Sequence, residues 1–272
     1  MPVPDAPSPL RADARVEVLV ARLPPDALDW PASDDPSAWC PRLGALAGRR
    51  PVDRTRSLAA DKMLDALCRR WQVPAHRYEP DGRPSCGQGA HLTASHDGDH
   101  VVAGIGERAV GLDVVDCRRR SGWVARIMSA DERDVPPPDL TSPDRASSGR
   151  FPSDAPSAQA RGRAWAVREA ALKWAGVGMA VDPRTLTVVS GPDRGERGEG
   201  ASLAPASQVR LGPGEASRPS PGLWLGQAWW TVRFPDGRAV PVVAGTVGAD
   251  HVLALAVELP VTVSSSDYQL AP

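Results

Sequence analysis

The stretch Trp165-Ala-Val-Arg-Glu169-Ala-Ala-Leu-Lys173-Trp-Ala-Gly176 predicts an amphipathic helix within residues 161–177. At 100° per residue, Trp165, Glu169 and Lys173 form one row along this helix. The opposite side carries an apolar stripe that can pack on a core: Val167, Ala170, Ala171, Trp174 and Val177. The packing face is complete without the row. Glu169 and Lys173 therefore form either a solvated i,i+4 ion pair or part of a functional site.

A second long helix is predicted at residues 53–73, where apolar side chains recur at a helical period and Pro74 follows. Strands are expected at 15–20, 91–95, 100–105, 110–115, 185–190, 223–234, 239–246 and 251–259. Residues 135–160 and 190–222 are rich in Pro, Ser, Asp and Gly, which is typical of mobile insertions. Residues 261–272 are interpreted as a frayed tail.

A faint internal repeat indicates how these elements are organised. Residues 54–59 and 161–166 share the pattern R-x-R-[SA]-[LW]-A, and His100-Val-Val-Ala resembles His251-Val-Leu-Ala. Either chance or a duplication explains so short a match. A duplication predicts an α+β fold with two similar lobes related by a pseudo-twofold, each a small antiparallel sheet with a long helix. The N-terminal lobe would span residues 15–112 and the C-terminal lobe residues 113–260.

Composition limits the class of protein. The 272 residues include 32 Lys and Arg against 33 Asp and Glu, so no protein-wide field for nucleic acid is expected. The four cysteines lack zinc-ligand spacing, which favours reduced thiols in a cytoplasmic protein. No signal peptide and no apolar run of membrane-spanning length is found in the sequence, so no membrane association is expected.

Three segments carry residues suited to chemistry. Ser95-His96-Asp97-Gly98 at a strand end is either an ordinary turn or an anion site, and adjacent strand residues cannot converge as a catalytic triad. Asp113 interrupts an apolar strand, so it either caps a turn or has a cation or hydrogen-bonding partner. With Glu169 it would offer the hard oxygen ligands that Mg²⁺ prefers. Lys173 could neutralise phosphates bound to that ion.

In chain order, these segments match the patterns S-H-x-G, G-[IL]-D and W-x-x-[KR]-E-[AS]-x-x-K-x-x-G. The order resembles the 4′-phosphopantetheinyl transferases of the Sfp-like class, over residues 45–190 and weakly to residue 259. The resemblance implies a cytoplasmic, Mg²⁺-dependent monomer that serves polyketide, nonribosomal peptide or fatty-acid synthesis. It would transfer phosphopantetheine from coenzyme A to a serine of an acyl- or peptidyl-carrier protein, releasing 3′,5′-adenosine bisphosphate.

The resemblance also implies roles for particular residues. Asp113 and Glu169 would be the metal ligands, and these two with Lys173 would be the catalytic residues. Lys173 would contact the pyrophosphate, and Glu169 would be the candidate base for the serine proton. The remaining contacts to coenzyme A would come from Arg56, Arg83, Ser95 and His96.

Several positions depart from the family pattern or stay open. Val115 stands where many members carry a second strand carboxylate, and Asp116 should face the other side of the strand. Arg168 replaces the usual lysine, and either Arg42 or Arg49 is a further phosphate contact. Residues around 123–128 form either a carrier-docking patch or core: Trp123, Val124, Ile127 and Met128.

Two other functions compete with the transferase. Val115 favours a non-catalytic module that binds coenzyme A or a nucleotide on the same scaffold. A DNA-binding regulator could use the arginine-rich helix starts, but the balanced charge and the lack of a helix-turn-helix pattern argue against it.

Overall fold

The structure is a computed structural model that describes residues 14–24, 40, 43–46, 48–87, 89–119, 128, 158–190, 209–211, 223–248, 250–259 and 261–268. It is an α+β fold with two β-sheets. The first sheet has the strand order β2-β3-β4-β5-β1-β12-β8. Its strands are β1 (Ala14–Arg22), β2 (Arg77–Tyr78), β3 (Pro84–Ser85), β4 (His91–Asp97), β5 (His100–Gly106), β8 (Val209–Leu211) and β12 (Val261–Asp267).

The second sheet is antiparallel and has the order β6-β11-β10-β9-β7. Its strands are β6 (Val110–Asp116), β7 (Thr187–Ser190), β9 (Leu223–Arg233), β10 (Ala239–Val247) and β11 (His251–Val257). The helices are α1 (Leu43–Leu46), α2 (Pro51–Arg70) and α4 (Ala158–Ala175), with short 3-10 turns η3 (Cys117–Arg119), η6 (Gly178–Ala180) and η7 (Pro183–Thr185). No helix among these described segments is long and apolar enough to span a membrane.

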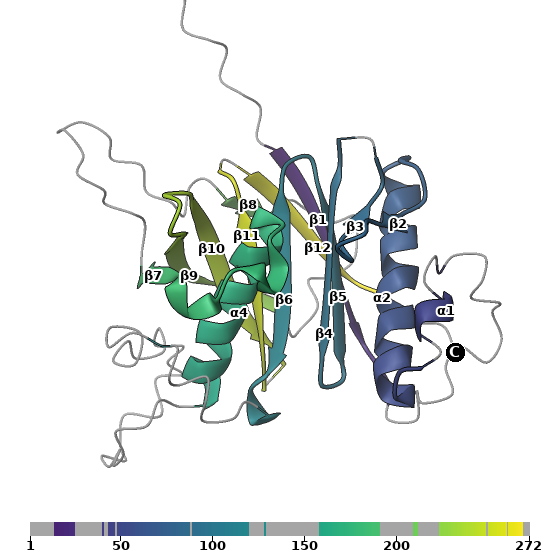
Figure 1. Cartoon of the computed structure of the whole chain (residues 1–272), viewed down its shortest axis with the longest axis horizontal. Helices are drawn as coiled ribbons and strands as arrows, with labels where there is room; N and C mark the ends of the chain where they lie inside the picture. The colour runs from purple at the N-terminus through teal and green to yellow at the C-terminus, as the bar shows by residue number, and fades with distance from the viewer. Residues whose placement is uncertain are drawn as a thin grey trace, which may run out of the picture.

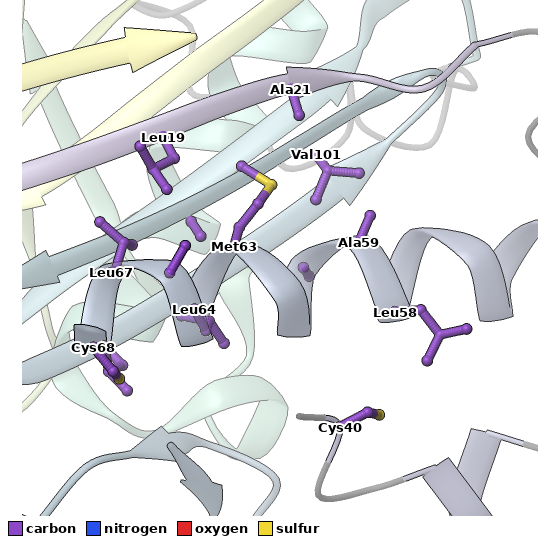
Figure 2. Close-up of a cluster of buried hydrophobic side chains, with 14 of the residues drawn as sticks. Leu19, Ala21, Cys40, Leu58, Ala59, Met63, Leu64, Leu67, Cys68 and Val101 are labelled. Atoms are coloured by element: carbon purple, nitrogen blue, oxygen red, sulfur yellow. The ribbon is translucent and has the colours of Figure 1, made fainter. Parts of the chain in front are cut away.

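The two sheets pack face to face, and one long helix covers the outer face of each. In Figure 1, α2 and α4 lie on opposite sides of the paired sheets. Strand alternation explains these layers: Leu19 and Ala21 of β1 face α2, whereas Val18 and Val20 join the core between the sheets. Figure 2 shows the core between α2 and the first sheet, where the α2 side chains lie against the strands.

Helix α4 approaches its sheet unusually closely, because glycines stand at two contact points. A Cβ on Gly111 of β6 would overlap the carbonyl oxygen of Ala170 and lie 2.5 Å from the backbone nitrogen of Trp174. A Cβ on Gly162 would lie 2.5 Å from Cys117 Sγ. The helix therefore rests with its backbone almost directly on β6.

Both long helices end in the same hydrogen-bonded motif. At the end of α4, Gly176 (φ +67°) donates to Lys173 O, and Val177 donates to Leu172 O. At the end of α2, Gln72 (φ 54°) takes the equivalent left-handed position, so this helix ends before residue 73. The predicted helix at 53–73 therefore ends too late, and α4 begins at Ala158 rather than at 161.

The interpretation of residues 261–272 as a frayed tail was wrong for 261–267. These residues form β12, which pairs in parallel with both β1 and β8. The first sheet is consequently mixed rather than purely antiparallel. Residues 209–211, expected within an insertion, form β8 in the same sheet.

Candidate active site

The candidate site lies where β4 of the first sheet and β6 of the second lie side by side. Side chains of alternate β4 residues bond to β6: Thr93 Oγ1 accepts from Leu112 N at 3.1 Å, and Asp97 Oδ2 accepts from Asp116 N at 3.0 Å. Ser95 lies between them on the same face of β4. Thr93 and Asp97 were not predicted as site residues. Each lies two positions from Ser95, and this spacing places all three side chains on one face of the strand.

Asp113 is the centre of this site. Ser95 Oγ donates to Asp113 Oδ1 at 2.6 Å, and Lys173 Nζ donates to the same oxygen at 2.8 Å. The Asp113 side chain is 8% exposed and the Lys173 side chain 27%. The structure thus brings together one predicted residue from each of the three motifs.

Lys173 is held by the protein through all three of its protons. Besides Asp113, Nζ donates to Leu112 O at 3.0 Å and to Ala94 O at 3.3 Å. The close approach at Gly111 is what lets a lysine on α4 reach the backbone of both β6 and β4. Its charge neutralises the buried carboxylate of Asp113.

The second carboxylate oxygen of Asp113, Oδ2, indicates whether a cation would fit at this site. Asp113 Oδ2 is buried and has no hydrogen-bond partner among the residues that the structure describes. An unpaired carboxylate oxygen removed from water is costly, and carboxylate oxygens are the ligands that Mg²⁺ prefers. The residues present therefore fit a small divalent cation.

Glu169 lies on α4, one turn before Lys173, and is half-buried. The helix thus presents Trp165, Glu169 and Lys173 as half-buried residues, while Ala166, Ala170 and Ala171 are fully buried in the core beneath it. Because Trp165 packs against the same core as Trp174 and Val177, the predicted separation of a packing face from the row is only partly confirmed.

Arg83 reaches the C-terminal end of α4. Its backbone N–H and its Nε both donate to Asp81, at 3.1 and 2.6 Å, which fixes the turn. A Cβ on Gly176 would overlap Arg83 Nη1, so the guanidinium lies directly against that backbone. Arg83 and Lys173 are therefore both placed around the last turn of α4.

Arg56 and His96 belong to the other side of β4. His96 follows Ser95 along the strand and so lies on the same face as Ala94, which packs on the core beneath α2. Arg56 is a buried residue of α2, its Nη1 lies 3.3 Å from Asp53 Oδ1, and its Nε has no hydrogen-bond partner. The structure does not show either residue in contact with the Asp113 group.

Val115 and Asp116 lie on opposite faces of β6. Val115 is fully buried against the alanines of α4, so no second carboxylate faces the helix beside Asp113. Asp116 is also fully buried, and it accepts hydrogen bonds from Arg118 Nε and Nη2, each at 2.9 Å. Although burial opposes its ionisation, the bonds from Arg118 lower the pKa of Asp116. Asp116 does not replace the missing acid.

The other positions left open have structural partners or cannot be placed. Arg168 is buried and donates to Pro183 O and Ala164 O, at 3.2 and 3.1 Å, so it ties α4 to η7. Arg49 Nη1 donates to Ser57 Oγ at 3.3 Å. Met128 is buried. Arg42, Trp123, Val124 and Ile127 lie outside the described residues.

No family model matches this chain, and no curated protein matches it significantly.

Proposed function

We propose that this protein is a 4′-phosphopantetheinyl transferase that modifies a serine of an acyl- or peptidyl-carrier protein. The observation that carries the proposal is the shared hydrogen-bonded group of Ser95, Asp113 and Lys173. These residues come from the three motifs on which the family resemblance rests. The buried, unpaired Oδ2 of Asp113 supports a bound cation beside them.

In the proposed reaction, the carrier serine hydroxyl attacks the β-phosphate of coenzyme A, and 3′,5′-adenosine bisphosphate leaves. Glu169 takes the serine proton as the new P–O bond forms. Arg83 binds the oxygens on which negative charge accumulates as the old P–O bond breaks, and Lys173 joins it by exchanging a backbone hydrogen bond for one to a phosphate oxygen. Mg²⁺ held by Asp113 and Glu169 would supply further charge neutralisation. Ser95, His96 and Arg56 would bind the 3′-phosphoadenosine end.

The arrangement of the two sheets supports a further part of the proposal, a two-lobed protein with a pseudo-twofold. The repeated R-x-R segments lie in α2 and α4, which cover the outer faces of the two sheets. The repeated His-Val-[VL]-Ala segments begin β5 and β11, and the rings of His100 and His251 are 4.1 Å apart. Equivalent residues that meet in this way are expected close to a twofold axis.

The decisive experiment is a mass-gain assay. The full chain is incubated with an apo carrier protein, coenzyme A and Mg²⁺, and the carrier is weighed by mass spectrometry. The wild type should add phosphopantetheine, whereas Glu169→Gln and Asp113→Ala should not. Asp236→Asn is the matched control, because Asp236 sits in an exposed turn paired with Arg238. Full Mg²⁺-dependent transfer by either site variant would refute the metal assignment.

The competing function is a module that binds coenzyme A or a nucleotide without catalysis. The apolar burial of Val115 favours it, because one family carboxylate is absent from the face of β6 beneath α4. Calorimetry with coenzyme A distinguishes the two functions. Binding without any mass gain on several apo carriers would select the binding module.

A further inference from the structure

A second cluster of side chains, of the types that bind metal ions, lies outside the candidate active site where the β4–β5 turn meets the start of β11. Asp99 lies in the β4–β5 turn, His100 begins β5, and His251 begins β11. Leu23 N donates to Asp99 O at 2.7 Å, which fastens this turn to the chain leaving β1. The cluster therefore draws its three residues from both sheets.

The distances among their ligand atoms are close to those of a metal site. Asp99 Oδ1 lies 2.8 Å from His100 Nδ1 and 3.4 Å from His251 Nε2. All three ligand atoms lie within 4.8 Å of one another. Ligands about 2.0–2.1 Å from a tetrahedral ion stand roughly 3.3 Å apart, so small side-chain shifts would complete the geometry.

The chemistry of the cluster also favours an ion. His251 is 4% exposed, and its Nε2 is buried with no hydrogen-bond partner in the described part of the chain. Asp99 Oδ2 accepts a hydrogen bond from Arg22 Nε at 2.7 Å, which leaves Oδ1 as the oxygen next to the two imidazoles.

A glycine and a further carboxylate lie close to the His251 imidazole. Gly98 (φ +60°) is the turn residue, and a Cβ there would lie 2.5 Å from His251 Nε2 and 2.8 Å from Asp116 Oδ2. Asp116 Oδ2 lies 4.0 Å from His251 Nε2 and adds negative charge close to the ligands. A side chain at this position would overlap the imidazole, so the close approach of the turn to β11 requires glycine.

We propose that Asp99, His100 and His251 bind a transition-metal ion of the zinc class, with water in the remaining position. Two imidazoles and one carboxylate suit Zn²⁺ or Co²⁺, whereas Mg²⁺ requires oxygen ligands. The ion would join the β4–β5 turn of the first sheet to β11 of the second. The site is independent of the proposed transferase reaction and of its Mg²⁺.

Cobalt tests the site directly, because tetrahedral Co²⁺ absorbs visible light more strongly than octahedral Co²⁺. The full chain, stripped with chelator and desalted, is titrated with Co²⁺. The expected result is an intense visible spectrum that saturates at one ion per chain, disappears when Zn²⁺ is added, and survives excess Mg²⁺. Thermal unfolding of the same samples should shift upward with either transition metal.

Variants assign the ligands. His251→Ala and Asp99→Asn should each weaken Co²⁺ binding by at least roughly tenfold, the lower range seen even for outer-shell partners of a metal. His91→Ala is the matched control, since His91 is exposed at the far end of β4. Asp99 lies in a turn, so the Asp99→Asn variant is expected to fold, which circular dichroism checks. This variant therefore tests the site even if His251→Ala does not fold.

Three outcomes would overturn the proposal: no intense visible spectrum with millimolar Co²⁺, undiminished binding in both ligand variants, or a thiolate-to-cobalt absorption band that assigns the ion to cysteine.

Discussion

Asp113 is a charged residue in an apolar strand, and its partners explain why the strand tolerates it. Lys173 and Ser95 share Oδ1, while Oδ2 stays unpaired and buried. Removing one member of a buried ion pair usually costs more than the pair contributes, because the remaining charge stays desolvated. The same residues that serve the proposed chemistry therefore also determine local stability.

Lys173→Met should lower the free energy of unfolding by about 1–3 kcal/mol, since Asp113 would keep only the Ser95 hydrogen bond. Urea denaturation measures the change. The matched control is Lys62→Met on α2, the other lysine of the chain, which is expected to cost less. Equal losses in the two variants would contradict a structural role for the Lys173–Asp113 pair.

Cys68 gives a prediction about pH. Burial, with smaller effects of Cys86 and Asp65, raises the pKa of the Cys68 thiol from 9.0 to about 11. The stability linked to this shift is fully present below pH 9 and is lost as pH rises toward 11, because the unfolded thiol ionises first. Thermal unfolding at about pH 8 and about pH 10 should show a smaller alkaline loss in Cys68→Ala than in wild type. An identical loss would contradict the shift.

At the scale of elements, the contact between α4 and β6 depends on a residue without a side chain. A Cβ at position 111 would meet helix backbone, which cannot rotate away as a side-chain tip could. The glycine of the G-[IL]-D motif therefore has a packing explanation, because it sets the distance at which Lys173 reaches Asp113.

Gly111→Ala should force α4 outward and cost about 1–3 kcal/mol or more, by the overpacking typical of well-filled cores. Because the shift separates Lys173 from Asp113, phosphopantetheine transfer should also fall. Gly44→Ala in α1 is the control, since nothing lies within 4 Å of a Cβ there. Unfolding curves that coincide for the two variants would show that α4 is not held so closely.

Much of the secondary structure could be predicted because its signals are local. The apolar period of α4 and the short apolar runs of β5, β6 and β11 are visible in the sequence itself, and the predicted ranges lie close to the observed ones. In β12, Val261-Thr-Val263 is followed by Ser-Ser-Ser-Asp267, which resembles a polar tail. Its partner β1 lies at the other end of the chain, so only the tertiary structure reveals the strand.

The candidate site was predictable to a similar degree. An acid inside an apolar strand predicts a partner, and Asp113 has two. Which residues supply them depends on how the two sheets meet, and sequence spacing does not contain that information. For the same reason, the sequence does not reveal that Asp99 and His100 lie close to His251. These contacts form only when β5 and β11 come together.

At the scale of the whole molecule, β12 connects the end of the chain to its beginning. Val261 and Val263 are buried in the core between the sheets, and the strand lies between β1 and β8. Truncation after Leu259 should therefore give a protein that unfolds at much lower urea concentration or fails to fold. Val263→Asp should cause a comparable loss, whereas Asp267→Asn, at an exposed position, should not. A truncated chain with wild-type stability would contradict the structural role of β12.

The pairing of β1 with β12 also has a consequence during protein synthesis. Ser264 Oγ donates to Val16 O across 248 positions of the chain. At ordinary translation rates, the time between the synthesis of β1 and the synthesis of β12 is on the order of 10–50 s. During that time β5 can cover only one edge of β1, so the other edge is open to nascent chains and chaperones. The first sheet is therefore expected to be most exposed to wrong pairing before β12 is made.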